Sequence, residues 1–451
     1  MDQPSTPSVT ESRNPDETTA ERSGLSSVKS SQRPSRHAVR PFRPEFWRSP
    51  LRGPWLTSFL GTLLIPSIAV IALTGFIDHW AHYPEFAGND AVGPAGDIPV
   101  LFHFPTSWPS WSYAVTQGTH VTLGVIVLPL VLAKLWSVMP KLFQRPMVRS
   151  LAGALERISI LGLVASVLVE FATGIFEMQD WAPWNFNFNI VHYYGAWVFG
   201  TLFVLHTCIK LPVVLRAYRE RGALKPLMQS LAETRPEPPD AGGLAPINPA
   251  APTISRRGLL AMIGGAALTI FAVQVGESVG GPFRRLALLA PRGRVFGTGP
   301  NDFPVTHTAA YAQITPTMIS EDWRLTVAGA RTISFGRQQL LAMPQATRTI
   351  TITCTDGWST TQRWTGVQLS ALARLADASE GAVLRPGTLQ PGVGAEALPP
   401  SLYNDERSLL ALRVNGVDIS VDHGYPARVI LPNVPGGMNT KWVSELRFEA
   451  A

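Results

Sequence analysis

Five long apolar segments, separated by polar ones, occupy much of the N-terminal part of the chain. Each is close to the roughly 20 residues that a helix needs to cross the hydrocarbon core of a bilayer. Because a spanning helix bonds its backbone groups internally, helices are the structure expected of such segments in lipid. The pattern therefore predicts membrane-spanning helices at Trp55–Ile77, Tyr113–Trp136, Ile158–Phe176, Ile190–Leu215 and Gly258–Gly276.

The pattern changes after residue 290, where short runs alternate between apolar and polar positions and end at turn residues. Such alternation is typical of strands. Strands are predicted at Trp323–Gly329, Arg348–Thr353, Leu409–Gly416, Arg428–Pro432 and Trp442–Phe448, with a helix at Gly366–Leu375. The fold class that follows is a multi-domain membrane protein, with a four-helix transmembrane bundle, one anchor helix and then an α+β domain.

Segments rich in small and polar residues separate these parts. The first 50 residues carry few large apolar side chains, so we expect disorder there. Residues 225–254 are rich in Pro, Glu, Gly and Ala and are expected to be a flexible linker. The predicted division is a disordered N-terminus at 1–50, the four-helix domain at 51–216, a cytoplasmic linker at 217–257, the fifth helix at 258–280, a second linker at 281–299 and the α+β domain at 300–451.

The low share of charged residues and their distribution support a chain that lies partly in lipid. Charged residues are 16% of the 451 residues, below the roughly 25% of soluble domains. The net charge of +6 does not indicate nucleic-acid binding, because Lys and Arg gather beside the apolar segments. Loops 80–112 and 179–189 contain no Lys or Arg, whereas 137–157 and 216–257 are basic. This asymmetry predicts a multi-pass protein of the cytoplasmic (inner) membrane, with its N-terminus cytoplasmic and its C-terminal domain extracytoplasmic.

The first four apolar segments form two similar halves. Thr74-Gly75 ends the first segment as Thr173-Gly174 ends the third, while His120 and His192 open the second and the fourth. Two imidazoles at one depth can bind a haem iron from both sides. The alternative for a single intramembrane histidine is an interhelical hydrogen bond. The pair predicts one haem b with His120 and His192 as iron ligands.

This arrangement resembles the haem-binding membrane subunits of the cytochrome b561 and formate dehydrogenase type, over about residues 55–216. In those families a histidine at the spacing of His206 serves a second haem. Here Lys134 stands at the matching position of the second segment, so His206 is left as a candidate for a second haem, a proton contact or a quinone contact. Two roles are left open for Glu170: it could take a proton from quinol, or it could form a structural pair with another side chain. His79, His82 and His103 are expected at the surface or on a docking face, although His79 could replace one of the two iron ligands.

Cys354 stands in Cys354-Thr-Asp-Gly-Trp358, directly after an alternating β-branched run. The other cysteine, Cys208, lies in a predicted membrane helix, so no disulfide framework is expected. A single cysteine in the C-terminal domain is therefore either a packed small residue or a metal ligand.

Cys354 and the later segments His423-Gly-Tyr-Pro-Ala-Arg428 and Asn439-Thr440-Lys441-Trp442 resemble the molybdopterin-binding domain of the sulfite oxidase family. Trp323-Arg-Leu and Trp364-Thr-Gly also occur in the family's order, and the resemblance covers about residues 300–449. It implies that the Cys354 thiolate binds molybdenum.

The resemblance also implies which residues hold the molybdopterin (molybdenum cofactor). His423, Arg428 and Lys441 would bind the pterin and its phosphate, since Arg and Lys donate charge-assisted hydrogen bonds to phosphate. Further residues implied at the cofactor site are Asn439, Thr440, Asn301, Phe303 and His307. The tyrosine that the family usually carries after the cysteine has no clear counterpart, with Tyr403 the nearest.

Ser255-Arg256-Arg257-Gly258-Leu259-Leu260 at the head of the fifth segment resembles a twin-arginine export signal, placed internally. The alternative is two arginines that only set the topology of an ordinary anchor. Because molybdopterin is inserted in the cytoplasm, the loaded domain must cross the membrane folded, which favours the export signal.

The sequence thus predicts a molybdopterin-dependent oxidoreductase that resembles the periplasmic methionine sulfoxide reductase system, with its molybdenum and haem parts in one chain. Electrons would pass between the quinone pool and a small extracytoplasmic substrate through haem b, with oxygen-atom transfer. The alternatives are a sulfite-type dehydrogenase that donates electrons to quinone and a non-catalytic electron carrier. Quinone or quinol, the lipid bilayer and the substrate are the expected partners; a homo-oligomer stays open.

Overall fold

The computed structural model describes residues 44–82, 107–143 and 151–450, apart from residues 180, 182, 185, 187, 241 and 395. The predicted disorder of the N-terminus falls almost entirely on residues outside these ranges, as does His103. The side chain of His82 is likewise outside the description. The structure therefore bears on the helices, the segment that follows them and the C-terminal domain.

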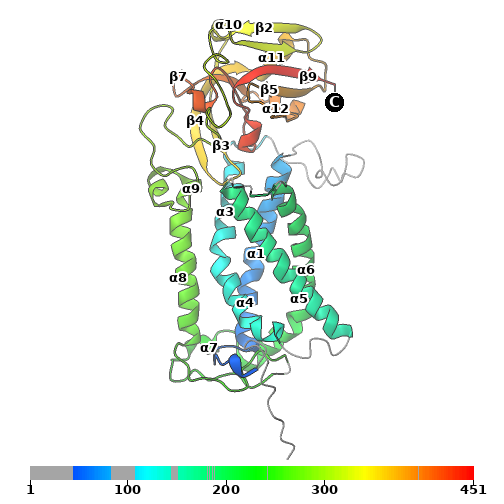
Figure 1. The fold of residues 1–451 in the computed structure, drawn as a ribbon, viewed down its shortest axis with the longest axis vertical. Helices are drawn as coiled ribbons and strands as arrows, with labels where there is room; N and C mark the ends of the chain where they lie inside the picture. Colours follow the sequence, from blue (N-terminus) through cyan, green and yellow to red (C-terminus); the bar gives the residue numbers. More distant parts are fainter. Residues whose placement is uncertain are drawn as a thin grey trace, which may run out of the picture. The chain divides into compact units, whose positions relative to one another are not determined.

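Helices form where the apolar segments predict them (Figure 1). They are α1 (Pro54–His82), α3 (Ser112–Ile126), α4 (Leu128–Leu142), α5 (Leu151–Met178), α6 (Phe188–Arg221) and α8 (Arg256–Gln274). The second predicted helix is divided at Val127 into α3 and α4. Pro129 explains the division, because its ring nitrogen cannot donate a hydrogen bond to the preceding turn.

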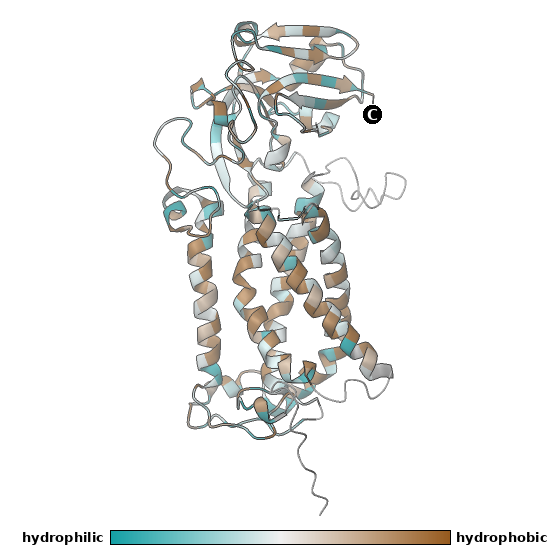
Figure 2. Cartoon of the chain, in the orientation of Figure 1, coloured by the Kyte–Doolittle hydropathy of each residue, from teal (hydrophilic) through white to brown (hydrophobic). Residues whose placement is uncertain are grey.

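Five spans of these helices are long and apolar enough to cross a membrane, which confirms the predicted number. They run over Pro54–Ala81, Ser112–Leu142, Gly153–Met178, Phe188–Arg221 and Arg256–Val279. Figure 2 shows that apolar residues predominate along these helices. Long helices of this composition are expected in a membrane. Insertion and topology remain predictions.

The helices pack as one bundle with α8 added at its side. α1 contacts α3, α4 and α6, and α5 packs along α6. α8 contacts α3 and α4, and Ser255 caps its first turn by accepting a hydrogen bond from the Gly258 amide. The division into a four-helix bundle and one anchor helix stays a prediction.

The segment between α6 and α8 differs from the expected flexible linker. Its short helix α7 (Lys225–Met228) packs near α8, and Glu237 lies buried against three helix ends. The Glu237 carboxylate accepts a hydrogen bond from the Trp55 amide at 3.0 Å and lies 3.6 Å from Arg221. Arg256 is fully buried and donates to the Arg235 carbonyl at 2.9 Å. Paired charges and helix capping therefore fix a segment whose composition suggests a loose chain.

The C-terminal domain contains two sheets. One has the order β2-β1-β9-β5, and the other joins β3, β4, β6 and β7, with β8 also paired to β6. The strands are β1 (Arg324–Ala328), β2 (Thr332–Gly336), β3 (Ala346–Thr353), β4 (Ser359–Gln368), β5 (Val383–Thr388), β6 (Leu409–Val414), β7 (Val417–Asp418), β8 (Arg428–Ile430) and β9 (Val443–Glu449). Only β1 and β9 pair in parallel; the other named strand pairs are antiparallel. The α+β prediction is confirmed.

Short helices and 3-10 turns occur between the long helices and strands and at their ends. They are α9 (Gly276–Val279), α10 (Arg337–Ala342), α11 (Leu369–Leu375) and α12 (Pro400–Tyr403), with single 3-10 turns η2 (Pro44–Phe46), η4 (Gly281–Leu286), η5 (Val421–His423) and η6 (Gly436–Met438). The predicted helix at Gly366–Leu375 begins later than expected. Gly366 belongs to β4, where a Cβ atom would lie 2.0 Å from the Leu410 carbonyl oxygen of the neighbouring strand.

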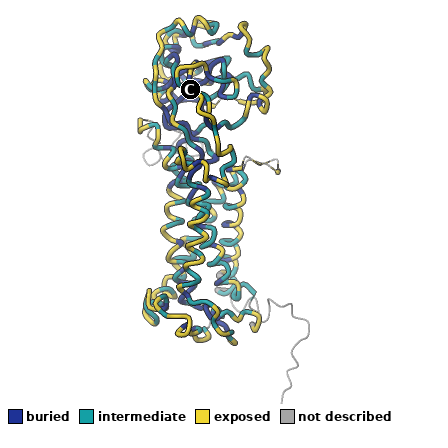
Figure 3. The backbone as a smooth tube through the Cα atoms, turned by 90° about the vertical axis from the view of Figure 1, so that its left-hand side faces the viewer, coloured by how far each residue is buried: buried dark blue, intermediate teal, exposed yellow. Residues whose placement is uncertain are grey.

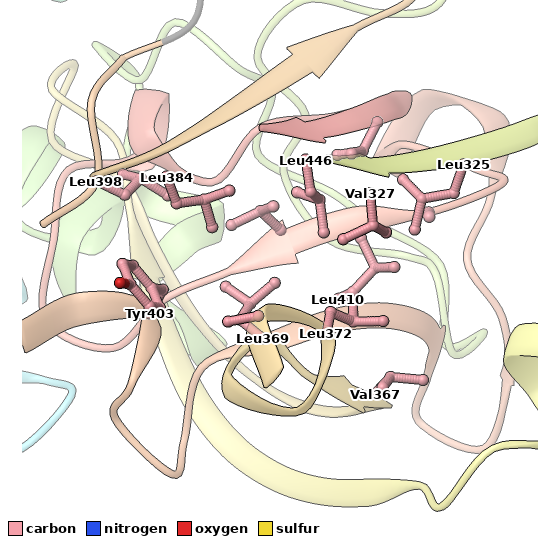
Figure 4. Close-up of a cluster of buried hydrophobic side chains, with 14 of the residues drawn as sticks. Leu325, Val327, Val367, Leu369, Leu372, Leu384, Leu398, Tyr403, Leu410 and Leu446 are labelled. Atoms are coloured by element: carbon pink, nitrogen blue, oxygen red, sulfur yellow. The ribbon is translucent and has the colours of Figure 1, made fainter. Parts of the chain in front are cut away.

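The main core of the domain fills the space between the two sheets. Leu325 and Leu446 come from the first sheet, Val367 and Leu410 from the second, and Leu372 from α11 (Figure 4). Burial in the chain gathers in this domain, while the long helices are mostly intermediate or exposed (Figure 3). A second core on the other side of β3 and β4 contains Ile352 and Trp364 and reaches Cys354.

Candidate active site

Cys354 lies at the turn between β3 and β4. The last four residues of β3 are buried, so this strand leads the chain into the domain interior just before the cysteine. The Cys354 amide donates to the Trp358 carbonyl at 2.9 Å, and the Gly357 amide donates back to the Cys354 carbonyl at 3.0 Å. We call residues 354–358 the cysteine loop. Its backbone hydrogen bonds hold the thiol in a fixed position.

Two neighbouring side chains orient the sulfur. Thr306 donates its hydroxyl to Cys354 Sγ at 3.4 Å and accepts a hydrogen bond from Trp358 Nε1 at 2.9 Å. Asp356, two residues after the cysteine, receives a hydrogen bond and ion pair from Arg292 Nε at 2.9 Å. Neither Thr306 nor Arg292 was predicted, because each is far from the cysteine in sequence.

His423, Arg428 and Lys441 meet beside the cysteine loop, as predicted. Gly424 makes this possible: its φ is +113°, and a Cβ atom there would lie 3.1 Å from Lys441 Cβ and 3.3 Å from Arg428 Cβ. The left-handed backbone favours glycine at this position. His423 is buried, stacks on Phe303 with ring centroids 3.6 Å apart and donates from Nε2 to the Asn301 carbonyl at 2.9 Å.

The two cations are held by backbone oxygens. Lys441 Nζ donates to the carbonyls of Thr306, His307 and Asp422 at 2.8 to 3.0 Å. Buried Arg428 donates to the carbonyls of Asn439 and His423 at 3.3 and 3.2 Å. Within the described part of the chain, neither cation forms an ion pair with a carboxylate, so the site retains positive charge.

Asn439 contributes a further donor. Its side-chain oxygen accepts a hydrogen bond from the Leu431 amide at 2.7 Å, while its Nδ2 is buried without a hydrogen-bond partner among the described residues. A buried donor that lacks a partner costs free energy, about 1–3 kcal/mol, unless a ligand satisfies it. This atom therefore points to a ligand that accepts hydrogen bonds.

A cavity of about 470 Å³ joins these residues, a size usual for small-molecule sites. Its lining combines the cysteine loop with His423, Arg428 and Lys441 and with residues of other elements, which include Glu177, Asn189, Arg292, Pro304, Val305, Thr306, His307, Thr388, Gln390, Val393, Gly394, Glu396, Asn439 and Thr440. Glu177 belongs to α5 and Asn189 to α6, so the helical part also contributes to the lining.

Burial shapes the electrostatics of the cavity. Burial, with the nearby Asp356, raises the pKa of Cys354 to about 12. Burial, and then the charge of Arg428, lowers the pKa of Lys441 to about 7 and that of His423 to about 3. Burial likewise lowers the pKa of Arg428 to about 10. Burial thus makes the charged forms of these side chains costly. An anionic ligand, together with a metal bound to the thiolate, would offset that cost.

Two predicted residues take other positions. Asn301 is absent from the lining and instead supports it: its side chain bridges the Ser420 amide and the Asp418 carbonyl, and its own carbonyl holds His423. Tyr403 is buried in the main core and donates to the Ala382 carbonyl at 2.7 Å, away from the cysteine loop. It cannot replace the family's tyrosine. His307 and Thr440 do line the cavity.

The histidines of the helical part form one close pair. The rings of His120 and His192 have centroids 6.0 Å apart and planes at 87°. His120 Nδ1 donates to the Ile71 carbonyl at 3.0 Å, and His192 Nδ1 lies 2.9 Å from Thr173 Oγ1, which itself donates to Val169. Both Nδ1 atoms are therefore the protonated ones, and each Nε2 is left with a lone pair.

The paired glycines fit the same picture. A Cβ atom on Gly75 would lie 2.7 Å from His120 Cε1, and one on Gly174 would lie 3.2 Å from His192 Cε1. Each ring thus rests against a position where only glycine leaves room. Glu170 lies 3.4 Å from His192 Nδ1, whereas the corresponding position of the first half is Ile71.

The remaining intramembrane candidates lie apart from this pair. His206 is half-buried on α6, and the corresponding Lys134 on α4 donates its ammonium to the Thr57 carbonyl at 2.5 Å. His79 stacks on Tyr193 with centroids 3.7 Å apart, so it is packed rather than exposed as expected. Within the described residues, no group of three His, Cys, Asp or Glu side chains gathers to hold a metal.

Comparison with known proteins assigns a family to the C-terminal part of the chain. Residues 312–451 match the family described as oxidoreductase molybdopterin binding domain. That part is a sulfite oxidase-like molybdopterin-binding domain. The predicted molybdopterin oxidoreductase is thereby confirmed for this region.

Each of the relatives matches about a third of the chain. Mitochondrial sulfite oxidase of Mus musculus is 28% identical over 167 residues, which cover 30% of this chain and 30% of that protein. The uncharacterized oxidoreductase YuiH of Bacillus subtilis is 29% identical over 154 residues, 32% of this chain and 73% of its own. The sulfane dehydrogenase SoxCD of Paracoccus pantotrophus is 26% identical over 29% of this chain and 39% of its own, with a TM-score of 0.28. The chain thus spans about a third of the sulfite oxidases that it matches.

The site residues fit the cofactor of this family. Cys354 offers one soft sulfur ligand, so the remaining metal ligands must come from the cofactor itself. Arg428, Lys441 and the unbonded Nδ2 of Asn439 supply donors for an anionic, hydrogen-bond-accepting group.

Proposed function

We propose that the protein is a membrane-bound molybdenum oxidoreductase that exchanges electrons between the quinone pool and an extracytoplasmic substrate through haem b. It would lie in the cytoplasmic membrane with its N-terminus inside and the molybdopterin domain outside. The observation that carries the proposal is that one chain combines a molybdopterin pocket with a histidine pair whose Nε2 atoms are available.

The histidine pair fits a haem iron. Metal–imidazole bonds are ~2 Å long, so two imidazoles on opposite sides of one ion have ring centroids roughly 6 Å apart. The observed separation of 6.0 Å matches this value. Glycines at Gly75 and Gly174 leave space beside the rings, and the Nδ1 hydrogen bonds fix the orientation of each imidazole.

Each side chain of the pocket has a defined part in the reaction. Bound molybdopterin supplies two-electron oxygen-atom transfer, and bound haem supplies single-electron transfer. Cys354 holds the metal through its thiolate, while Arg428, Lys441 and Asn439 hold the phosphate and pterin. Buried His423 positions the pterin and keeps its own proton on Nε2 toward Asn301.

Charge in the cavity favours a neutral substrate. Arg428 and Lys441 are committed to the cofactor, and Arg292 is paired with Asp356. The lining also carries the carboxylates Glu177 and Glu396. Carboxylates repel oxyanions such as sulfite, whereas an uncharged sulfoxide is not excluded. We therefore favour sulfoxide reduction over sulfite oxidation.

In the favoured direction, a sulfoxide, two protons and two electrons give a sulfide and water. The electrons come from a quinol, which becomes a quinone and releases two protons. The reverse flow, from sulfite to quinone, is the second candidate, and a relative named sulfite oxidase supports it.

The test is to purify the full chain from membranes and measure molybdenum, haem iron and turnover. We expect both metals, a b-type optical spectrum and sulfoxide reduction with a quinol analogue as donor. Sulfite oxidation with a quinone acceptor would instead establish the second candidate. Both cofactors without turnover would indicate an electron carrier, and the lack of either metal would show that the proposal is wrong.

A further inference from the structure

The cysteine loop rests directly on the helix that carries His120. Gln117 of α3 is buried, and its side-chain Nε2 donates to the carbonyl of Thr355, the residue after Cys354, at 2.5 Å. Gln117 and His120 are three positions apart on α3, which is ~4.5 Å along the axis at ~1.5 Å per residue. One hydrogen bond therefore connects the cysteine loop to the helix of a proposed haem ligand.

The contact around Gln117 is close. A Cβ atom on Gly357, whose φ is +102°, would lie 3.0 Å from Val121 Cγ1, directly after His120. At the start of α3, the amide of buried Tyr113 donates to Asn433 Oδ1 at 2.8 Å. Glycine in the cysteine loop thus lets the loop backbone approach α3 without an intervening side chain.

A second helix also holds this loop but carries no haem histidine. Ser278 of α9 donates to the Gly357 carbonyl at 2.9 Å and accepts, at its own carbonyl, a hydrogen bond from Ser359 at 2.6 Å. The loop therefore has two anchors of the same kind, each a side-chain donor bonded to a loop carbonyl. Only one of the two, Gln117, lies on the helix of His120.

We infer that α3 is the electron path between the histidine pair and the cysteine loop, and that Gln117 is the positioning residue that joins the two. The inference rests on the proposed function. Each oxygen-atom transfer would take two electrons. In the favoured direction they would pass one at a time from bound haem to bound molybdenum, so that haem iron is oxidised by one electron as molybdenum is reduced by one. The path follows covalent bonds from His120 along the α3 backbone to Gln117. It then crosses one hydrogen bond to Thr355 and continues along the backbone to Cys354.

The experiment compares Gln117→Leu with Ser278→Ala in the full-length holoenzyme. Both variants remove one hydrogen bond to a carbonyl of the cysteine loop, and leucine keeps most of the glutamine volume. Three quantities are measured: the haem spectrum, the rate at which reduced haem is reoxidised by the substrate that turns over, and turnover with a small reduced dye that bypasses the haem. If sulfite is the substrate, haem reduction replaces reoxidation.

We expect Gln117→Leu to slow haem reoxidation several-fold while haem spectrum and dye-driven turnover stay at the wild-type level. Ser278→Ala should leave all three unchanged. Wild-type reoxidation in Gln117→Leu would overturn the inference, as would an equal loss of reoxidation and dye-driven turnover, which indicates a structural role only. Should Gln117→Leu not accumulate, Gln117→Met, which also cannot donate, gives the same comparison.

These results separate the inference from the proposed function. If wild-type haem exchanges electrons with the substrate and Gln117→Leu behaves identically, only the path through α3 is wrong. If wild-type protein lacks haem, or its haem never exchanges electrons with any substrate, the proposed function fails and the path fails with it.

Discussion

His120 and His192 lie with ring centroids 6.0 Å apart, and each rests against a glycine that follows a threonine. The two halves of the bundle thus repeat the same local structure. Thr74-Gly75 contacts the ring of His120, and Thr173-Gly174 contacts the ring of His192. The repeat is not complete: a backbone carbonyl holds His120, while a hydroxyl and the nearby Glu170 hold His192. Under the proposed function, the two rings act as one unit that binds a haem iron.

That unit predicts the effect of removing either ring. His120→Ala and His192→Ala should each abolish the same b-type absorption band, because an iron held from both sides loses its low-spin geometry when one imidazole is absent. Optical spectra of purified membranes check this. His206→Ala is the matched control on α6 and should keep the band. An unaltered spectrum in His120→Ala or His192→Ala would refute the ligand pair.

Cys354→Ser should retain the pterin and lose turnover. The pterin is expected to stay because Arg428, Lys441 and Asn439 remain to bind it. Turnover should vanish because a neutral serine hydroxyl is a harder and weaker donor to a metal than a thiolate. Pterin fluorescence after oxidation and steady-state turnover measure the two effects. Cys208→Ser, at an exposed position of α6, should change neither. Activity at the wild-type level in Cys354→Ser would dismiss the thiolate assignment.

The sequence predicts those features that depend on local pattern. The length of the apolar segments predicts the spanning helices, and the motifs around Cys354, His423 and Lys441 bring together residues that do line one cavity. β5 was missed because Pro386 and Gly387 suggest a loop. β5 lies at the edge of its sheet, where a proline without an amide hydrogen is tolerated.

Contacts between distant positions were not predictable from pattern. Thr306 lies 48 positions from Cys354, and Gln117 lies 238 positions from Thr355. Neither residue belongs to a motif, and each acquires its role only when the fold brings it to the cysteine loop. The segment around Glu237 was expected to be flexible on composition alone, which carries no information about its buried charge partners.

Glu237→Gln should destabilise the ends of the helices that Glu237 joins. The carboxylate caps α1 through the Trp55 amide and lies beside Arg221, so its loss leaves a cation without its partner. Removing one member of a buried ion pair costs roughly 3 kcal/mol. Two measurements on the purified protein in detergent report this loss: the midpoint of thermal unfolding, and the rate at which a protease cuts within residues 225–254.

Glu233→Gln is the control for that variant, because Glu233 is an exposed carboxylate of the same segment. It should leave the unfolding midpoint and the proteolysis pattern nearly unchanged. Equal behaviour of the two variants would mean that Glu237 does not fix the segment.

Acidification should destabilise the C-terminal domain through His423. Burial, followed by the charge of Arg428, lowers the pKa of His423 to about 3, while an unperturbed histidine titrates near 6.5. Below pH ~6.5 the unfolded chain therefore binds a proton that the folded domain does not, so stability falls as the pH falls and continues to fall until about pH 3. Between pH 6.5 and 4.5 this group alone removes about 2 kcal/mol.

His423→Gln isolates this contribution, since glutamine can still donate to the Asn301 carbonyl but does not titrate. The calorimetric midpoint of the domain should depend less on pH in this variant than in the wild type. If His423→Gln keeps the wild-type slope, the acid sensitivity arises elsewhere, and His423 is protonated in the folded domain at a higher pH than its buried position indicates.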